Sequence, residues 1–479
     1  MCAMNRTDKT HFPPADMPDA RAGSHNRGAV LRALDTAHHM HPFTDYKGLA
    51  AEGGSRIIEK AEGTWLTDID GKRILDGMAG LWCVAVGYGR EELADAAHKQ
   101  MTELAYYNSF FKTATVPSIE LSKKLVDLTP EGLNHVFYAS SGSEANDTIF
   151  RMVRHYWNLA GKPKKKIIIG REYGYHGSTV AATSLCGMKH MHGQGDLPIP
   201  GVDHILPPYW YGKGGDMTQE EFGRHAALEL EKRIDELGED NVAAFIAEPI
   251  QGAGGMIIPP ETYWPEINRI CRERGILLIA DEVISGFGRT GHWFASEIYD
   301  IKPDFMTLAK AITSGYVPLS AVMVGDRVAE MFIDKGGEFY HGFTYSGHPV
   351  SCAVALKNIE IIEQEGLVER IRDVTGPYLN KKLNEAFADH PMVGEVRSIG
   401  MLAAIELVKD KETRSFFDDD DHVGQKCRDH CFANDLVMRA VRDTMVLSPV
   451  FTITEEEIDE MVARAKRAID ATAKDMGYL

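Results

Sequence analysis

The sequence lacks a long apolar run, a signal-peptide core and an excess of positive charge. No stretch approaches the length of a membrane span, and residues 1–28 are polar, so we expect neither a transmembrane helix nor a secretory leader. Lys and Arg number 52 against 70 Asp and Glu, a net charge of −18, which argues against nucleic acid or an anionic membrane as a partner. The seven cysteines in 479 residues show no close pairing, which indicates a reducing cytoplasm.

Patterns that would bind a metal are also scarce. Cys427 and Cys431 have His422 and His430 nearby, but their spacing, without a second cysteine pair, is poor for zinc, and we expect a helix surface instead. We therefore expect no metal site. The other histidine clusters, which lack a supporting carboxylate group in the sequence, are His38, His39, His41, His190 and His192.

The middle of the chain alternates short apolar runs with longer amphipathic segments such as Glu220–Leu237 and Glu261–Arg274. The chain is longer than one compact core usually holds, so we expect two domains. The alternation predicts a mostly parallel sheet with helices on both faces and a ligand site at the carboxyl ends of its strands. The predicted strands are Val136–Tyr138, Ile167–Ile169, Val242–Ala247, Ile276–Ala280, Phe305–Leu308 and Ala321–Val324.

After residue 346 the pattern changes to that of a smaller α+β domain. We expect helices at Val350–Gln364, Leu367–Phe387 and Glu455–Lys474, and strands at Val393–Ser398, Met401–Leu407 and Val446–Ser448. A strand at Trp65–Asp68, followed by a hairpin turn, could join this domain. The predicted division is a polar extension over 1–28, a large domain over 73–346, and a small domain of 29–72 with 347–479.

Asp281 and Lys310 carry the most specific chemical signal. Asp281 directly follows the apolar run Ile276–Ala280, and Lys310 lies further along among small and apolar residues. A pyridoxal-phosphate site needs such a pair, because a carboxylate keeps the pyridine nitrogen protonated and an amine forms a Schiff base with the aldehyde. Taken alone, the aspartate could be a helix cap and the lysine a solvated side chain. The prediction of a pyridoxal-phosphate site therefore depends on the further motifs.

A phosphate site is predicted where a strand runs into a helix. Ser141, Gly142 and Ser143 begin the helix in YASSGSEANDT, and helix N-terminal N–H groups with two hydroxyls suit a phosphate monoester. An ordinary serine N-cap explains one of these residues more easily than all three. Thr344, in HGFTYSGHP, could complete the phosphate site in its own or a neighbouring subunit.

Other motifs supply aromatic and polar side chains for a planar ligand. Tyr175 in EYGYHGST could stack on the ring or fill the core, and His176 is expected to be a structural hydrogen-bonding residue. Glu248 in AFIAEPIQGAGG could bind a polar edge of the ring or cap a helix. Trp82 and Phe110 lie among glycine-rich or polar turns, which favours a pocket wall.

Together these motifs resemble the class III aminotransferases of the fold-type I pyridoxal-phosphate superfamily. The likeness runs from about Phe43 to the C-terminus through SGSEAND, GYHGST, AEPIQGAGG, ADEVISGFGRTG, AKAITSGY and FTYSGHP. FTDYKGL, MAGLWCVAVGYG, PPYWYGKGGDM and GGEFYHGFTYSGHP resemble most the ω-amine:pyruvate type that acts on putrescine or polyamines. The resemblance implies an α/β fold: a large domain with a mostly parallel, seven-stranded type of sheet, plus a smaller α+β domain.

The resemblance also implies residue roles. Lys310 and Asp281 would be the catalytic residues, and Arg439 would bind the carboxylate of pyruvate or alanine. The implied cofactor-binding residues are Ser141, Gly142, Ser143, Tyr175, Glu248, Asp281, Val283, Lys310 and Thr344, the last from the partner subunit. The implied substrate-binding residues are Trp82, Phe110, Tyr175 and Arg439. Ala85, Arg442 and Val450 depart from the family pattern, which has Asn, a small residue and Pro there.

We therefore expect a pyridoxal 5′-phosphate enzyme that moves an amino group from a primary amine (a diamine, a polyamine or another ω-amine) to pyruvate, giving an aldehyde and L-alanine. We expect a cytoplasmic homodimer with shared active sites, and a tetramer stays open. One alternative is another reaction on the same fold, aminomutase or decarboxylase chemistry. A cofactor-binding regulator without turnover would need a nucleic-acid or partner module, for which the sequence offers no candidate. The physiological donor is left open.

Overall fold

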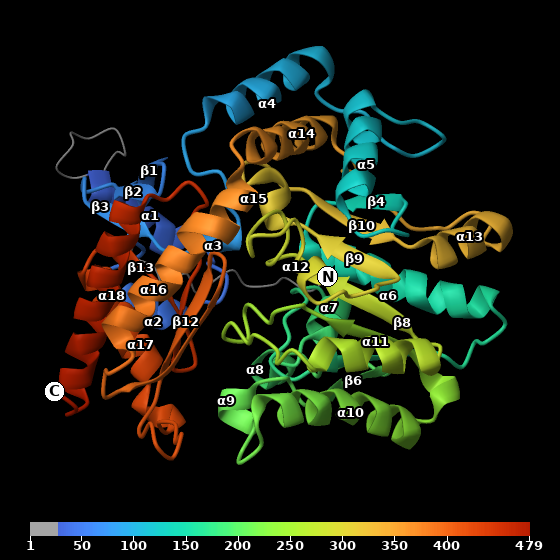
Figure 1. Ribbon diagram of the computed structural model, residues 1–479. Helices are drawn as coiled ribbons and strands as arrows, with labels where there is room; N and C mark the ends of the chain where they lie inside the picture. The colour runs from blue at the N-terminus through green and yellow to red at the C-terminus, as the bar shows by residue number, and fades with distance from the viewer. Residues whose placement is uncertain (1–26) are drawn as a thin grey trace, which may run out of the picture.

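The computed structural model describes residues 27–479, so most of the predicted N-terminal extension lies outside the described residues. Its largest sheet has seven strands in the order β4-β10-β9-β8-β7-β5-β6 (Figure 1). The strands β9, β8, β7, β5 and β6 are parallel, and β10 is antiparallel to both of its neighbours. The predicted mostly parallel sheet is thereby confirmed. The strands are β4 (His135–Ala139), β5 (Ile167–Arg171), β6 (Val202–Ile205), β7 (Val242–Ala247), β8 (Leu277–Asp281), β9 (Phe305–Leu308) and β10 (Ser320–Val324).

Helices cover both faces of this sheet because alternate strand residues point to opposite sides. Leu277 and Ile279 of β8 pack in one core with α6 (Gly142–Leu159). Leu278 and Ala280 pack in another core with α10 (Gln219–Leu237) and α11 (Tyr263–Glu273). The helices expected at Glu220–Leu237 and Glu261–Arg274 are confirmed to within a few residues. The edge strand β6 was missed, because VDHI has two polar residues and no apolar run.

Two smaller sheets lie beside the large one and join distant parts of the chain. One contains β1 (Ile58–Glu62), β2 (Trp65–Asp68), β3 (Arg73–Asp76) and β13 (Leu436–Val437), with β13 parallel to β3. The other contains β11 (Val393–Ile399), β12 (Leu402–Leu407), β15 (Thr444–Leu447) and β14 (Arg439–Val441). Figure 1 shows β1 and β2 beside α18 (Glu455–Asp475), where the Trp65 indole donates to Glu457 at 2.8 Å.

The helix expected at Leu367–Phe387 is interrupted. It consists of α15 (Leu367–Arg370), a π-helical turn (Ile371–Thr375) and α16 (Gly376–Phe387). Pro377 explains the break, because it has no N–H to donate to the carbonyl four residues earlier and its ring would crowd that group. The preceding helix, α14 (Pro349–Gln364), is continuous, as predicted.

Two expectations about metal-binding residues need correction. Cys427 and Cys431 lie on a helix, α17 (Val423–Ala433), but both are fully buried rather than on its surface. The spacing of four residues places both on the inner face of the helix. His39 and His41 do have a carboxylate partner: Asp35 bonds His39 Nδ1 at 3.0 Å and His41 Nε2 at 2.8 Å. Asp35 lies near the end of α1 (Arg27–His38), one helical turn before His39.

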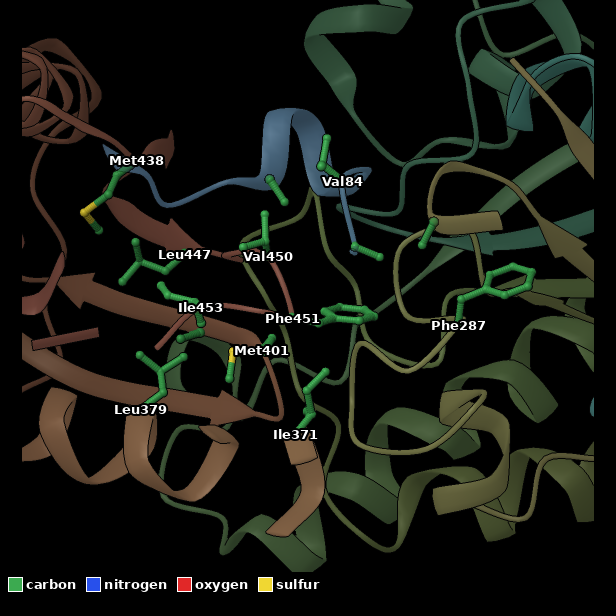
Figure 2. Packing of buried hydrophobic residues seen from close by; sticks show 14 of the residues in the cluster. Val84, Phe287, Ile371, Leu379, Met401, Met438, Leu447, Val450, Phe451 and Ile453 are labelled. Atoms are coloured by element: carbon green, nitrogen blue, oxygen red, sulfur yellow. The ribbon is translucent and has the colours of Figure 1, made fainter. Parts of the chain in front are cut away.

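The C-terminal strands share a core with the large domain. Figure 2 shows Phe451 extending toward Phe287, and Val450, Leu447 and Ile453 belong to the same buried cluster. The Phe451 N–H donates to the carbonyl of Ala85 at 2.8 Å. Two of the three departures from the family pattern, Ala85 and Val450, are therefore buried packing positions.

Shorter helices complete the structure. Within residues 27–479, no helix combines the length and apolarity that crossing a bilayer requires. The remaining helices are α2 (Tyr46–Ala51), α3 (Ala79–Trp82), α4 (Glu91–Leu104), α5 (Val116–Leu128), α7 (Val180–Leu185), α8 (Lys189–His192), α9 (Trp210–Lys213), α12 (Ala295–Ile298) and α13 (Asp326–Lys335), with 3-10 turns at Glu239–Asn241, Lys310–Thr313 and Asp419–Asp421.

Candidate active site

A cavity of 310 Å³ contains most of the predicted site residues. It lies where β4, β5, β7, β8 and β9 run into the segments that follow them, the edge at which parallel sheets bind ligands. We call it the lysine cavity. Its walls include Ser141, Gly142, Ser143, Tyr175, Glu248, Asp281, Val283 and Lys310, eight of the nine residues predicted to bind the cofactor.

Asp281 is buried at the end of β8 and held by three donors. His176 Nδ1 lies 2.8 Å from Asp281 Oδ2, and the amide of Asn146 donates to the same oxygen at 2.9 Å. The N–H of Val283 donates to Oδ1 at 3.2 Å. A carboxylate can accept about four hydrogen bonds. Asp281 is therefore oriented by its neighbours and retains capacity for a ligand N–H.

Lys310 starts a 3-10 turn directly after the strand β9 and Ala309. Its φ of 52° places a non-glycine residue in the left-handed region, a conformation that costs energy and is typical of functional sites. Burial lowers the pKa of its amine, and Arg439 lowers that pKa further, whereas Cys83, Asp281 and Glu248 oppose the shift. The cavity therefore favours a neutral amine, which can act as a nucleophile or base.

The N-terminus of α6 opens into the same cavity. Ser141 caps the helix by accepting the N–H of Glu144 at 3.2 Å, and Ser143 Oγ accepts the N–H of Ser178 at 3.0 Å. Gly142 lies against Val283, where an added Cβ would come within 3.2 Å of Val283 Cγ2. Gly142 and Val283 thus pack against each other in the wall of the cavity, and the helix N–H groups there suit an anion.

Glu248 and Tyr175 form another wall. The Glu248 carboxylate accepts the N–H of Tyr175 at 3.0 Å and the N–H of Gly252 at 2.9 Å, so it joins two loops as well as lining the cavity. Burial raises the pKa of Glu248. The Tyr175 hydroxyl lies 3.1 Å from Ser178 Oγ, which fixes the ring beside the helix terminus.

A second cavity of 420 Å³ adjoins the first, because Tyr175 lines both. We call it the outer pocket. Arg439 and Arg442 line it, and the guanidinium of Arg439 lies over the Trp82 ring at 4.9 Å. Trp82 is buried behind this contact. Arg442 lies in the turn between β14 and β15, and this turn brings both arginines to one cavity.

Thr344 and Phe110 line neither cavity within the described chain. Thr344 is exposed, and its carbonyl accepts the hydroxyl of Tyr106 at 2.7 Å. The Phe110 ring is 37% exposed and packs near Gly342. Both residues therefore belong to one surface region, away from Lys310.

Sequence reasoning missed Asn146 and gave His176 only a structural role. Asn146 also accepts the hydroxyl of Thr307 at 2.7 Å, which connects α6 to β9 behind Asp281. Its place in SGSEAND, one helical turn after Gly142, is a signal that it faces the sheet beside the cavity. For His176 the hydrogen-bonding role was right, but its partner is Asp281 itself.

Known proteins share this architecture. The family model for aminotransferase class-III matches residues 49–469. The putrescine–pyruvate aminotransferase of Pseudomonas aeruginosa is 60% identical over 442 residues, covering 92% of this chain and 96% of that protein. The diaminobutyrate–2-oxoglutarate transaminase of Halomonas elongata is 45% identical over 440 residues, covering 90% and 94%. The solved structure of the omega transaminase of Pseudomonas jessenii in complex with PMP has a TM-score of 0.91 and 41% identity, covering 94% of this chain and 99% of that one.

Proposed function

Because the chain belongs to the class-III aminotransferase family, whose cofactor is pyridoxal 5′-phosphate, we propose that it transfers an amino group from a primary ω-amine to pyruvate. Diamines and polyamines are within this donor range, since the relative from Pseudomonas aeruginosa is a putrescine–pyruvate aminotransferase. The products are an aldehyde and L-alanine. The observation that carries the proposal is the buried Asp281 facing the same cavity as Lys310 and the α6 N-terminus.

The residues of the lysine cavity fit this cofactor. The α6 N-terminus, with Ser141 and Ser143, would bind the phosphate, and Thr344 of the partner subunit would complete that site. A planar ring would lie in the cavity beside Gly142, with Val283 and Tyr175 in contact with its opposite faces. Glu248 would hold the loop that carries Tyr175 against the ring. When bound, the cofactor supplies an aldehyde for the amine and a ring that stabilises negative charge at the substrate carbon.

Asp281 and Lys310 would perform the proton chemistry. The Asp281 carboxylate would hold a proton on the ring nitrogen, and His176 and Asn146 would keep the carboxylate in place. Lys310 would hold the cofactor through its aldehyde, and its Nζ would move a proton at the substrate carbon when the donor amine is bound. A neutral Lys310 amine is required for that role, and burial favours it.

Arg439 would bind the carboxylate of pyruvate and alanine. A guanidinium can pair with a carboxylate through two parallel hydrogen bonds. Trp82 supports the guanidinium from behind, and Tyr175 lies on the side toward the lysine cavity. Phe110 would reach the substrate pocket only from a neighbouring subunit, since it does not line the cavities of its own chain.

We propose a cytoplasmic homodimer with shared active sites, and the predicted division into a large and a small domain with β3 (Arg73–Asp76) counted with the small one, because β3 pairs with β2 and β13. Support for a dimer comes from exposed aromatic side chains around Phe110 and Thr344: Tyr106, Tyr107, Phe111, Tyr340 and Tyr345. Such a surface is typical of an interface. The six described cysteines are unpaired, which supports a reducing compartment.

The decisive experiment follows alanine formation from pyruvate and n-butylamine or putrescine. We expect stoichiometric alanine and aldehyde from the native chain, and no turnover from Lys310→Ala. Carbon dioxide release or an isomerised amino acid without alanine would instead support a decarboxylase or mutase. Cofactor binding without any product would contradict the proposal as a whole.

A further inference from the structure

Two imidazoles and one carboxylate meet where α1 ends, outside both cavities. His39 Nδ1 lies 3.0 Å from one carboxylate oxygen of Asp35, and His41 Nε2 lies 2.8 Å from the other. The centres of the two rings are 4.1 Å apart, and the three potential ligand atoms all lie within 4.8 Å of one another. Within residues 27–479 no other three His, Cys, Asp or Glu side chains converge in this way. Two histidines with one carboxylate are a common ligand set for divalent transition metals.

The local sequence DTAHHMH (35–41) builds this group from a helical turn and the coil after it. Asp35 and His39 are four residues apart, and the N–H of His39 still donates to the carbonyl of Asp35 at 2.8 Å, so both side chains lie on one face of that turn. His41 reaches the same carboxylate from the coil. The carbonyl of His41 accepts the hydroxyl of Tyr46 at 3.0 Å, which helps to fix the coil. The three groups are therefore brought together by the backbone before any ligand binds.

The Asp35 carboxylate is held as an anion without a lysine or arginine partner. Ser55 Oγ donates to Asp35 Oδ2 at 2.5 Å. This bond, more than those from His41 and His39, lowers the pKa of Asp35 to about 2, although partial burial opposes the shift. Within the described part of the chain, His39 and His41 are the only ion-pair partners of Asp35. An ionised carboxylate only accepts hydrogen bonds, so each ring must carry a proton on the nitrogen that faces it. A divalent cation can replace these two protons and bind all three side chains.

We propose that Asp35, His39 and His41 form a binding site for a divalent transition-metal ion, and that Zn²⁺ is the ion that fits it best. Imidazole and carboxylate ligands suit zinc, and three protein ligands leave its fourth position to water. Ser55 would orient the carboxylate from behind, as residues that bond metal ligands usually do. The side chains of Asp35 and His41 are 17% and 23% exposed, whereas that of His39 is 61% exposed and leaves the site open to solvent. The expectation of no metal site, drawn from the sequence, would then be wrong for this motif.

The ion would join the end of α1 to the coil that carries Phe43. Phe43 follows His41 by two residues, has a φ of 49° and lines the outer pocket. Residues 39–45 contain no helix or strand, so their backbone is not fixed by a hydrogen-bonded ladder. The role of the ion would therefore be structural: it would stiffen one edge of the outer pocket and take no part in amino transfer.

Calorimetric titration with ZnCl₂ tests the site on the cofactor-loaded full chain, prepared without a polyhistidine tag and freed of metal with a chelator. We expect one Zn²⁺ to bind per chain. His41→Ala should weaken this binding by more than about a hundredfold, because a residue that only supports a metal ligand already contributes about 10–100-fold. Ser55→Ala should fall within that smaller range. Asp35→Asn should lose the binding, because a neutral amide is a poor zinc ligand.

His38→Ala is the matched control. His38 is an exposed histidine of the same motif and lies outside the group of three ligands, so this variant should bind Zn²⁺ as the native chain does. A second readout reports the ligands directly. Electron paramagnetic resonance of bound Cu²⁺ should show coupling to both imidazole nitrogens in the native chain and in His38→Ala, and to a single one in His39→Ala. A third is hydrogen–deuterium exchange, which Zn²⁺ should slow over residues 39–45 in the native chain but not in Asp35→Asn.

A native chain that binds Zn²⁺ only at millimolar concentration, or no better than Asp35→Asn does, would overturn the site. So would an equal loss of affinity in His38→Ala and His41→Ala, since binding would then depend on the number of histidines and not on the group around Asp35. Exchange over residues 39–45 that Zn²⁺ leaves unchanged in the native chain would overturn the structural role of the ion.

Discussion

At the scale of single residues, Asp281 is a charged side chain whose position is fixed by hydrogen bonds. It is buried, and its three donors are a histidine, an asparagine and a backbone N–H. None of these three groups is a lysine or an arginine. A buried carboxylate of this kind interacts strongly with a cationic ligand atom, because the local dielectric is low.

Replacing Asp281 by Asn should abolish catalysis without unfolding the chain. The amide keeps the shape and can still hydrogen-bond His176 and Asn146, but it cannot hold a proton on the ring nitrogen. We expect a loss of at least about two to three orders of magnitude, equivalent to 2.7–4 kcal/mol, in both half-reactions. Stopped-flow absorbance of each half-reaction measures it.

Glu282→Gln provides the comparison for Asp281→Asn. Glu282 is equally buried, but it bonds Ser285, Ser296 and the N–H of Ala295 and lies outside the lysine cavity. It should lower stability more than it lowers the rate of either half-reaction. Near-native rates in Asp281→Asn would remove this residue from the site.

The pH response of Lys310 follows from its burial. Its pKa is lowered from 10.5, so the amine becomes neutral at a lower pH than a solvated lysine does. Covalent capture of pyridoxal phosphate by the apoprotein, trapped by borohydride, should therefore accelerate with rising pH and level off below 10.5. A midpoint equal to that of free Nα-acetyl-lysine, measured in parallel, would show that the cavity leaves the amine unperturbed.

At the scale of elements, α6 contributes both to the proposed phosphate site and to the support of Asp281. Its first turn would meet the phosphate, and Asn146, one turn later, bonds Asp281 on the neighbouring strand end. One rigid helix therefore sets the distance between the anion site and the carboxylate. A small substitution at the first residue of α6 should therefore affect cofactor binding more than it affects folding.

Gly142→Ala tests the contact between Gly142 and Val283 at the start of α6. The added Cβ would lie 3.2 Å from Val283 Cγ2, so Val283 would have to shift within the wall that is proposed to contact the ring. We expect cofactor binding to weaken by roughly 1–3 kcal/mol, the usual cost of overpacking, with an unchanged circular-dichroism spectrum. Fluorescence titration of the apoprotein measures the dissociation constant.

Gly195→Ala is the control for this glycine change. Its added Cβ would meet nothing closer than Leu197 at 3.8 Å, and it lies outside both cavities. It should bind the cofactor as the native chain does. An equal loss of affinity in the two variants would mean that the effect is general and that the Gly142–Val283 contact does not shape the site.

At the scale of the whole molecule, the exposed position of Thr344 makes the proposed dimer testable. Co-expressed Lys310→Ala and Thr344→Ala chains form mixed dimers with a single intact lysine. If Thr344 acts across the interface, that lysine site receives the normal threonine of the lysine-deficient chain and should retain native cofactor affinity. If Thr344 acts within its own chain, the same site carries the altered threonine.

The measurement is the rate of cofactor release from purified mixed dimers carrying two different affinity tags. Homodimers of Thr344→Ala are the control and should release the cofactor faster than native dimers. Release from the mixed dimer at the rate of this control would contradict a shared site. A chain that is monomeric at assay concentration would contradict the dimer directly.

The sequence by itself predicted the mostly parallel sheet apart from its edge strand β6, the helices on both faces, and most of the residues that line the lysine cavity. These follow from local information: apolar runs of strand length, helical periodicity, and motifs in which the functional residue directly follows a strand. Asp281 comes at the end of β8 and Lys310 just after β9, and neighbouring parallel strands deliver their ends to one edge of the sheet. The order of the motifs therefore already implied that Asp281 and Lys310 lie close together.

Only the tertiary structure decided what depends on contacts between distant segments. The pairing of β3 with β13, the edge strand β6, and the bonds of His176 and Asn146 to Asp281 join residues with no common pattern. Arg442 is the clearest case. In an extended chain the side chain of Arg442 would point to the face opposite that of Arg439. The turn after β14 instead brings it to the same pocket as Arg439. Periodicity determines the face of an element, but the direction of a side chain in a turn depends on the packing around it.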